Sequence, residues 1–363
     1  MGLHSPSIAV LGDTNIDVWF LLDERPRWND VIHSYRTMLV AGGKGLNMAL
    51  GVARLGGKAS LLSLMGDDIW AETLLQQIKE LTVRLGVSSD SSASDTSRAG
   101  EVILDDVLTI PGSTPICGVL TNHAVDDPAF IGTKRLTHWD GLALPSEWRS
   151  TIARAEVLVA CLAPPIELVY DAICAARESG ALVILNPGPP PRDVIEYQRL
   201  ADILEYVDVL VPNSYEARRL ISMKEGKSVD VSPAQLAEQL QEAIDIERIG
   251  LVCVTQGRAG FDAIYCSTEE SAAEVNRRKR HLKGKVHAIT TDPVGRGDAF
   301  CSALAVELAQ GKTVEYALRF AAAAASVAMR TPGGAAAMPS RQNVETRLRR
   351  QESTVVEVVG GKE

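Results

Sequence analysis

Several features that would assign a chain to a specialised class of protein are absent from this sequence. The six cysteines form no C-x-x-C pair and lie mostly inside apolar runs, so we expect reduced core residues and neither a disulfide framework nor a zinc site. No segment offers about 20 consecutive strongly apolar residues, and the N-terminus has no basic stretch followed by a long apolar one. The sequence therefore predicts a cytoplasmic protein with no transmembrane helix, signal peptide or membrane partner.

Positive charge is also scarce. The chain has 37 Lys and Arg residues against 46 Asp and Glu residues, a formal net charge of −9 at pH 7. Sequence-independent binding of nucleic acid depends on neutralising phosphates, so no nucleic-acid partner is expected. One basic run, residues 277–285, is expected to be a solvated strand edge or loop.

What is present is an alternation of short apolar runs with longer amphipathic stretches. The apolar runs predict strands at 7–12, 59–66, 156–162, 181–188, 207–213 and 251–257. The amphipathic stretches predict helices near 44–55, 69–81, 166–178, 214–222, 233–245, 298–310 and 314–329. Strands that are apolar throughout and separated by helices indicate an α/β fold with a doubly wound, mainly parallel sheet. Ligands of such sheets bind beyond the carboxyl ends of the strands.

Four segments do not follow this alternation. Residues 14–40 and about 98–135 hold extra short β-like runs without helices between them, which predicts either a small appended β-sheet or an irregular surface insertion. Within the chain, residues 88–97 are polar and loop-like. Residues 341–363 predict a charged C-terminal helix followed by a tail.

The strongest chemical signal is TTDPVGRGDAF at residues 290–300, followed by an apolar helical pattern. Gly295 and Gly297 allow a tight turn just before a helix N-terminus, whose unpaired N–H groups suit a phosphate or a developing phosphoryl charge. Asp298 falls in the first helical turn. It is either an ordinary N-terminal helix carboxylate or a base that accepts a hydroxyl proton during phosphoryl transfer.

A second signal is AGGKGLNMALGVARL at residues 41–55, a glycine-rich loop that runs into an amphipathic helix. Gly42 and Gly43 would let a ligand approach the backbone, with Lys44 and Asn47 as polar contacts; the alternative is a glycine-rich cap before a packed helix. The spacing of a Walker A loop is missing, which disfavours P-loop chemistry.

A third signal, GDTNID, leaves the first predicted strand. Asn15 and Asp17 are two residues apart and would point the same way in an extended backbone. In order, the blocks GDTNID, GGKGLN, MGDD, NPGPP, PNSYEA, VTQGRAG and DPVGRGD resemble the ribokinase-like (PfkB) family of carbohydrate kinases, over residues 7 to about 340. The blocks GGKGLN and DPVGRGD, together and in this order, are the specific part of this resemblance.

The resemblance implies a kinase domain over residues 1–340, with a small β-sheet lid drawn from about 14–40 and 98–135. It implies an ATP-dependent kinase that transfers the γ-phosphate to a primary hydroxyl of a sugar or sugar-like small molecule. Asp298 matches the family's general base, and Gly295, Arg296 and Gly297 match its anion hole. Phosphoryl transfer fits these residues, because it needs alignment and charge stabilisation more than covalent help.

The remaining site residues also follow from the resemblance. The positions that match the sugar-binding residues are Asn15, Asp17, Gly42, Gly43, Lys44 and Asn47. Those that match the nucleotide-binding residues are Asn213, Thr255, Gly257, Gly260 and Gly297. Glu216 matches the family's Mg²⁺-organising carboxylate. A loop for a monovalent cation such as K⁺, which the resemblance leaves open, would involve Asp292, Val294, Gly333 and Ala337.

Departures from the family pattern leave the acceptor open. Where ribokinases carry a sugar-contacting Glu after the third core strand, this chain has Ala163, which disfavours plain ribose. The alternatives are a nucleoside kinase, a kinase of phosphorylated sugars, and a non-catalytic ligand-binding or regulatory relative. A phosphorylated sugar would need extra cations, for which the candidates are Arg98, Lys134 and Arg135. A homodimer through an exposed lid face with Trp19 and Phe20 also stays open.

Overall fold

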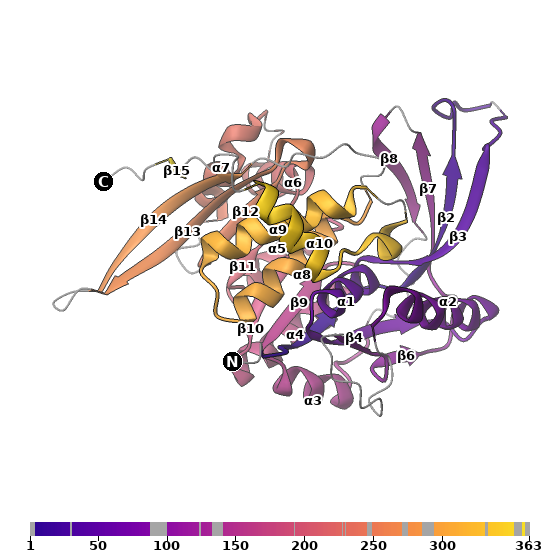
Figure 1. Ribbon diagram of the computed structural model, residues 1–363, viewed down its shortest axis with the longest axis horizontal. Helices are drawn as coiled ribbons and strands as arrows, with labels where there is room; N and C mark the ends of the chain where they lie inside the picture. Colours follow the sequence, from indigo (N-terminus) through magenta and orange to yellow (C-terminus); the bar gives the residue numbers. More distant parts are fainter. Residues whose placement is uncertain are drawn as a thin grey trace.

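A large sheet and a small sheet organise the chain in the computed structural model (Figure 1). In spatial order the large sheet contains β15 (Val358–Val359), β14 (Val275–Gly284), β13 (Phe261–Glu270), β12 (Leu251–Thr255), β11 (Val209–Leu210), β10 (Leu182–Asn186), β9 (Val157–Cys161), β1 (Ser7–Leu11), β4 (Lys58–Met65) and β5 (Glu101–Ile103). A further strand, β6 (Val107–Thr109), also pairs with β4. Pairing is parallel from β12 to β5 and antiparallel from β12 to β15.

The structure describes residues 4–29, 31–87, 100–122, 125–132, 141–191, 193–226, 228, 230–244, 249–270, 275–284, 294–330, 333–351 and 358–359. Among these residues no helix is long and apolar enough to cross a membrane. The polar segment 88–97, the three candidate cations of a phosphorylated-sugar site and Asp292 lie outside the described residues.

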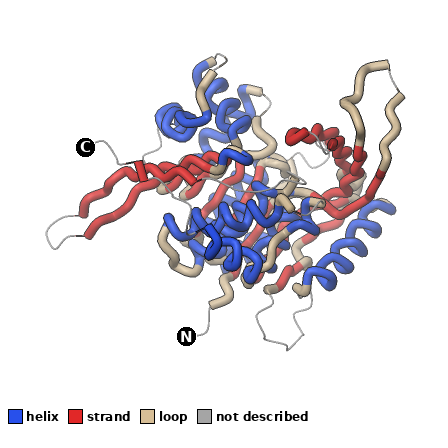
Figure 2. The backbone as a smooth tube through the Cα atoms, turned by 45° about the horizontal axis from the view of Figure 1, so that its top comes forward, coloured by secondary structure: helices blue, strands red, loops and turns tan. Residues whose placement is uncertain are grey.

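Helices cover both faces of the large sheet, as Figure 2 shows. One face carries α1 (Lys44–Arg54), α2 (Ile69–Leu85), α8 (Arg296–Ala309), α9 (Val314–Ala328) and α10 (Arg341–Gln351). The other carries α3 (Ser146–Arg154), α4 (Ile166–Ser179), α5 (Val194–Leu204), α6 (Ser214–Glu225) and α7 (Leu236–Ile244). Within β1, Ile8 and Val10 belong to the first core while Ala9 and Leu11 belong to the second. Burial on both faces explains why these strands are apolar throughout, and it confirms the predicted doubly wound α/β fold.

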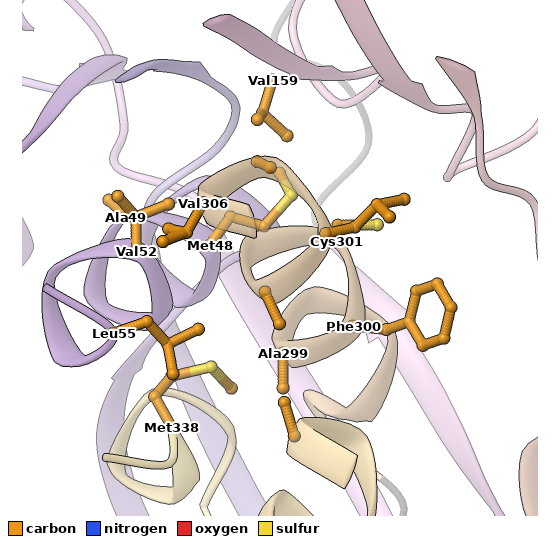
Figure 3. Close-up of a cluster of buried hydrophobic side chains, with 14 of the residues drawn as sticks. Met48, Ala49, Val52, Leu55, Val159, Ala299, Phe300, Cys301, Val306 and Met338 are labelled. Atoms are coloured by element: carbon orange, nitrogen blue, oxygen red, sulfur yellow. The ribbon is translucent and has the colours of Figure 1, made fainter. Parts of the chain in front are cut away.

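The two helices that begin at the glycine-rich motifs pack directly against each other. Figure 3 shows Met48 and Val52 of α1 beside Val306 of α8. Ser302 Oγ donates to the carbonyl oxygen of Met48 at 3.0 Å, and a Cβ atom on Gly51 would lie 2.4 Å from that hydroxyl. Glycine at position 51 therefore lets α1 and α8 approach closely enough to bring their N-termini together.

The small sheet has the order β3 (Arg36–Gly42), β2 (Asn15–Leu21), β7 (Ile116–Asn122) and β8 (Val125–Gly132). It projects from one end of the molecule, opposite the long β13–β14 hairpin (Figure 1). An appended sheet was one of the two structures predicted for these regions, and we call it the lid. However, only part of the segment 98–135 belongs to the lid. Its strands β5 and β6 pair with β4 of the large sheet, and Val102 of β5 is fully buried in the main core.

The expectation that Trp19 lies on an exposed face of the lid is wrong. Trp19 is 1% exposed and packs with Leu21 and Val119, and Val294 packs against this cluster from just before α8. The apolar lid residues that are exposed lie elsewhere, among them Phe130 and Ile131 on β8. Trp19 therefore fills the space beneath the lid and contributes nothing to a surface for a second copy.

Other parts of the chain carried weaker signals. The helices α3 and α5 were not predicted, although each has a buried face. The basic run falls largely on β14, where His281 lies in hydrogen-bond contact with the buried Asp262 of β13. The predicted charged C-terminal helix is α10, and its Val344 is fully buried against the core.

Candidate active site

The site forms at the point where the strand order reverses. In the large sheet, β1 lies between β4 and β9, and the chain runs outward from it in both directions. Such a switch point leaves a crevice beyond the carboxyl end of the central strand. Here the chain passes through residues 12–14 and enters the lid at Asn15. Asn15 and Asp17 are buried, and the Asn15 amide donates a hydrogen bond to Asp17 Oδ1.

Gly42 and Gly43 bring the end of β3 against this segment. A Cβ atom on Gly42 would lie 2.2 Å from Asp17 Oδ2, and one on Gly43 would lie 2.5 Å from the carbonyl oxygen of Asp13. Gly43 also has a φ of +102°, which side chains rarely tolerate. The two glycines are therefore required for the close approach of α1 to the end of β1.

Asp298 lies at the N-terminus of α8, after the left-handed Gly295 (φ +80°). It is 4% exposed. Lys44 Nζ is 3.3 Å from its Oδ1, and Asn47 Nδ2 donates to its Oδ2 at 2.8 Å. The amide oxygen Oδ1 of Asn47 is buried with no hydrogen-bond partner in the described structure. A buried acceptor without a donor is costly, so this oxygen is available to accept a hydrogen bond from another group.

Burial and mutual repulsion raise the pKa values of Asp13, Asp17 and Glu216. Burial raises the pKa of Asp17 to about 7, against the partial compensation of the Asn15 hydrogen bond. Burial also raises the pKa values of Asp13 and Glu216, and the positive charge of Lys44 opposes both shifts. For Lys44 itself, burial lowers the pKa, but the carboxylates of Asp298 and Glu216 outweigh it and hold the pKa above its ordinary value. Lys44 is therefore a permanent cation of the site.

A cavity of about 30 Å³ joins residues from several motifs. Its lining consists of Lys44, Asn186, Val211, Asn213, Glu216, Thr255 and Gly297. Asn186 and Val211 were not among the predicted site residues, although Asn186 ends β10 in the NPG block. The cavity therefore brings together Lys44, the pair Asn213 and Glu216, and Gly297 of the turn that begins α8.

Asn213 and Glu216 form a reciprocal capping box at the start of α6. The Asn213 side chain accepts from the Glu216 N–H at 2.9 Å, and Glu216 Oε2 accepts from the Asn213 N–H at 2.8 Å. The other oxygen, Oε1, lies toward Gly188, where an added Cβ atom would be 2.4 Å away. Capping therefore occupies one oxygen of Glu216, while the other lies beside Gly188.

The predicted nucleotide loop lies next to this helix start. Thr255 forms a β-bridge with Asn213, and Gly257 and Gly260 both have positive φ angles, +61° and +105°. The Arg296 guanidinium lies against Gly257, since a Cβ atom there would be 3.2 Å from Arg296 Nη2. The side chain of the anion-hole turn thus reaches the loop that follows β12.

The predicted cation loop is brought together in part. The 3₁₀ turn η4 (Gly334–Ala337) follows Gly333, which has a φ of +108°. A Cβ atom on Gly334 would lie 3.7 Å from Val294 Cγ1, so this turn packs on the residue before Gly295. Ala337 is buried there. Within the described ranges, no three His, Cys, Asp or Glu side chains gather as a metal cluster.

Comparison with known proteins shows which family the chain belongs to. The model of the pfkB family of carbohydrate kinases matches residues 5–341. The chain belongs to the PfkB family. A ribokinase from Bacillus subtilis is 27% identical over 346 residues, which cover 94% of this chain and 99% of that protein.

Solved structures share the fold. A putative ribokinase from Agrobacterium tumefaciens has a TM-score of 0.74 at 19% identity, covering 97% of this chain and 100% of that one. The ribokinase of Arabidopsis thaliana, solved with ribose and ATP, has a TM-score of 0.68 at 22% identity, covering 95% and 99%. As a PfkB carbohydrate kinase, the protein is a phosphotransferase that acts on a sugar.

Proposed function

We propose that this PfkB-family protein uses ATP to phosphorylate a primary hydroxyl of a sugar or sugar-like molecule, with Asp298 as the general base. The observation that carries the proposal is the placement of the Asp298 carboxylate. It lies at the N-terminus of α8, held by Lys44 and Asn47, while Gly297 of the same turn lines the adjoining cavity. A proton acceptor and an anion-binding backbone turn are therefore adjacent, as phosphoryl transfer requires.

The reaction follows from these positions. The acceptor's hydroxyl donates its proton to an Asp298 carboxylate oxygen while its own oxygen attacks the γ-phosphorus of ATP. The new O–P bond forms as the bond to the β-phosphate oxygen breaks, and ADP leaves. Backbone N–H groups of residues 295–297 and the positive end of the α8 dipole stabilise the charge on the transferring group. Lys44 balances the Asp298 charge before the proton arrives.

On the nucleotide side, Thr255, Gly257 and Gly260 supply the loop that we expect to hold the ATP phosphates and ribose. Arg296 lies against Gly257 and brings a guanidinium to this loop. Guanidinium groups match phosphate geometry through paired N–H donors, so Arg296 fits a contact with the phosphate chain.

The residues present also fit Mg²⁺ and a monovalent cation. Mg²⁺ retains water and binds through one or two carboxylates plus substrate phosphates. Glu216 suits this role, because it lines the cavity and its Oε2 alone serves the helix cap. When bound, Mg²⁺ would neutralise phosphate charge. The turn at Gly333–Ala337 packs on Val294, so the described residues of the proposed K⁺ loop lie beside the turn that begins α8.

The proposal is tested by a coupled assay of ADP release with Mg-ATP. The acceptors are ribose, deoxyribose, fructose, fructose 6-phosphate and nucleosides. Asp298→Asn keeps an acceptor oxygen for Asn47 and should lower kcat by about 10²- to 10⁴-fold while ATP still binds. Near-normal turnover by this variant would reject Asp298 as the base.

The same panel separates the alternatives. Turnover restricted to nucleosides would identify a nucleoside kinase. Stabilisation by a sugar in a thermal-shift assay, without ADP release for any acceptor, would identify a non-catalytic ligand-binding protein and refute the proposed activity.

A further inference from the structure

Asp13 lies in the short link between β1 of the large sheet and β2 of the lid. Its Oδ1 accepts hydrogen bonds from the N–H groups of Lys44 at 2.9 Å and Gly45 at 3.4 Å, which begin α1. Both helix N–H groups donate to the same oxygen, so Oδ2 keeps lone pairs for another donor. Capping α1 therefore uses Oδ1, and the carboxylate also interacts with its own backbone N–H.

A second small cavity borders Asp13. Its volume of about 20 Å³ has room for one water molecule, or for one hydroxyl or amino group of a ligand. Its lining consists of Gly12, Asp13, Ser63, Leu64, Trp148, Ala163 and Pro164. Trp148 Nε1 donates to the Asp106 carbonyl oxygen at 2.8 Å, and Ser63 Oγ is 3.1 Å from Thr14 Oγ1. Among these lining residues only Asp13 carries a charge.

The same carboxylate belongs to the electrostatic surroundings of the proposed base. Burial raises the pKa of Asp13, the charge of Lys44 lowers it, and the charge of Asp298 raises it further. Lys44 also compensates Asp298 and Glu216, so one ammonium group serves three carboxylates. An anionic acceptor placed among them would meet repulsion, whereas a neutral or cationic one would not.

We propose that Asp13 determines acceptor specificity: its carboxylate accepts a hydrogen bond from a hydroxyl or amino group that the acceptor places in the cavity beside Ala163. The acceptor is therefore a neutral or amino sugar and not a phosphorylated sugar. This inference rests on the proposed kinase function, and it adds a residue that the sequence motifs did not single out. The small neutral side chain of Ala163 leaves Asp13 as the charged group on this wall of the site.

The test replaces Asp13 by Asn. The amide oxygen can still accept from the α1 N–H groups, but the negative charge is lost. The probes are D-ribose, D-glucosamine and D-fructose 6-phosphate, assayed by ADP release at saturating ATP. We expect the variant's KM for the neutral and amino sugars to rise about 10- to 100-fold, because a hydrogen bond to a charged group is lost. The KM for ATP should stay unchanged.

A matched control separates binding from capping. Asp193 caps α5 by accepting from the Glu196 N–H at 2.9 Å, and it is exposed. Asp193→Asn makes the same chemical change at a helix start away from the site. We expect it to leave both KM values unchanged, and thermal denaturation of both variants should show that they are folded.

Calorimetric titration of D-ribose with a non-hydrolysable ATP analogue gives affinity without turnover. A wild-type protein that binds the sugar but releases no ADP would refute the kinase function, and the effect of Asp13→Asn on Kd would still decide the inference. Equal sugar affinity in the wild type and Asp13→Asn, or a wild-type preference for fructose 6-phosphate, would overturn the role of Asp13 while leaving the kinase function intact. Binding of none of the three sugars would overturn the inference as well.

Discussion

Asp17 should make the stability of this protein depend on pH. The side chain is 7% exposed, and burial raises its pKa from 3.8 to about 7. The folded chain therefore holds a proton that the unfolded chain releases between about pH 4 and pH 7. The stability that this proton confers is fully present below the unfolded pKa of 3.8, falls as the pH rises through about 7, and is constant above that.

The size of this change in stability follows from the shift in the pKa of Asp17. About three pKa units at about 1.4 kcal/mol each give about 4 kcal/mol over the full window. Between about pH 5 and pH 8, a range that is convenient for experiments, the titration of Asp17 should lower the free energy of unfolding by about 2–3 kcal/mol. Asp17→Asn removes the titrating group and keeps a side chain of the same shape against Gly42.

Urea unfolding of the wild type and Asp17→Asn at these two pH values measures the difference. The wild type should lose about 2–3 kcal/mol more than the variant when the pH rises from about 5 to about 8. Asp193→Asn, at an exposed helix cap, should show the same change in the free energy of unfolding with pH as the wild type. If the wild type and Asp17→Asn show equal changes with pH, the burial argument for Asp17 is refuted.

Three further predictions concern other contacts. Arg296→Ala should raise the KM for ATP about tenfold or more and leave the KM for the acceptor unchanged. The KM of Arg296→Lys for ATP should lie between those of the wild type and Arg296→Ala. Equal rises in both KM values would contradict a phosphate contact. Arg341 Nη2 lies 2.7 Å from the fully buried Glu307 Oε1, so Arg341→Ala should cost about 3–5 kcal/mol in urea unfolding, and a loss under about 1 kcal/mol would show that the pair is unimportant. Gly43→Ala would press a Cβ atom 2.5 Å from backbone and should abolish activity, whereas Gly86→Ala, also at positive φ but with no atom within 4 Å, should cost about 1 kcal/mol in stability and retain activity.

The parts of the fold that the sequence predicts are those where burial sets a local pattern. The start of α1 after Gly43 and the start of α8 after Gly295 follow from glycines that precede long apolar helical stretches. In contrast, β5 and β6 are three residues each, too short for a periodic pattern, and only their parallel pairing with β4 assigns them to the large sheet.

Tertiary contacts explain what the sequence could not predict. Trp19 is buried with Val119 of the neighbouring strand β7, and Val294, far along the chain, packs against the same cluster. Asp13 sits in a polar stretch that resembles an ordinary turn. Its contact with α1 arises only because Gly12 packs on Gly45, where an added Cβ atom would be 2.6 Å from the backbone. The motifs therefore predicted the candidate site, whereas the contact of Asp13 with α1 required the structure.

The order of the site residues along the chain has an evolutionary consequence. Apart from the cavity wall that includes Ala163, the proposed acceptor contacts fall within residues 13–47, and the proposed nucleotide contacts begin at Asn213. The two groups meet through the packing of α1 on α8, fixed in part by the hydrogen bond from Ser302 to Met48. Substitutions in this N-terminal segment and at position 163 can thus change the proposed acceptor contacts without changing the residues proposed to bind the nucleotide. The same division makes residues 12–47 a natural unit for grafting between relatives, provided that the buried face of α1 is kept.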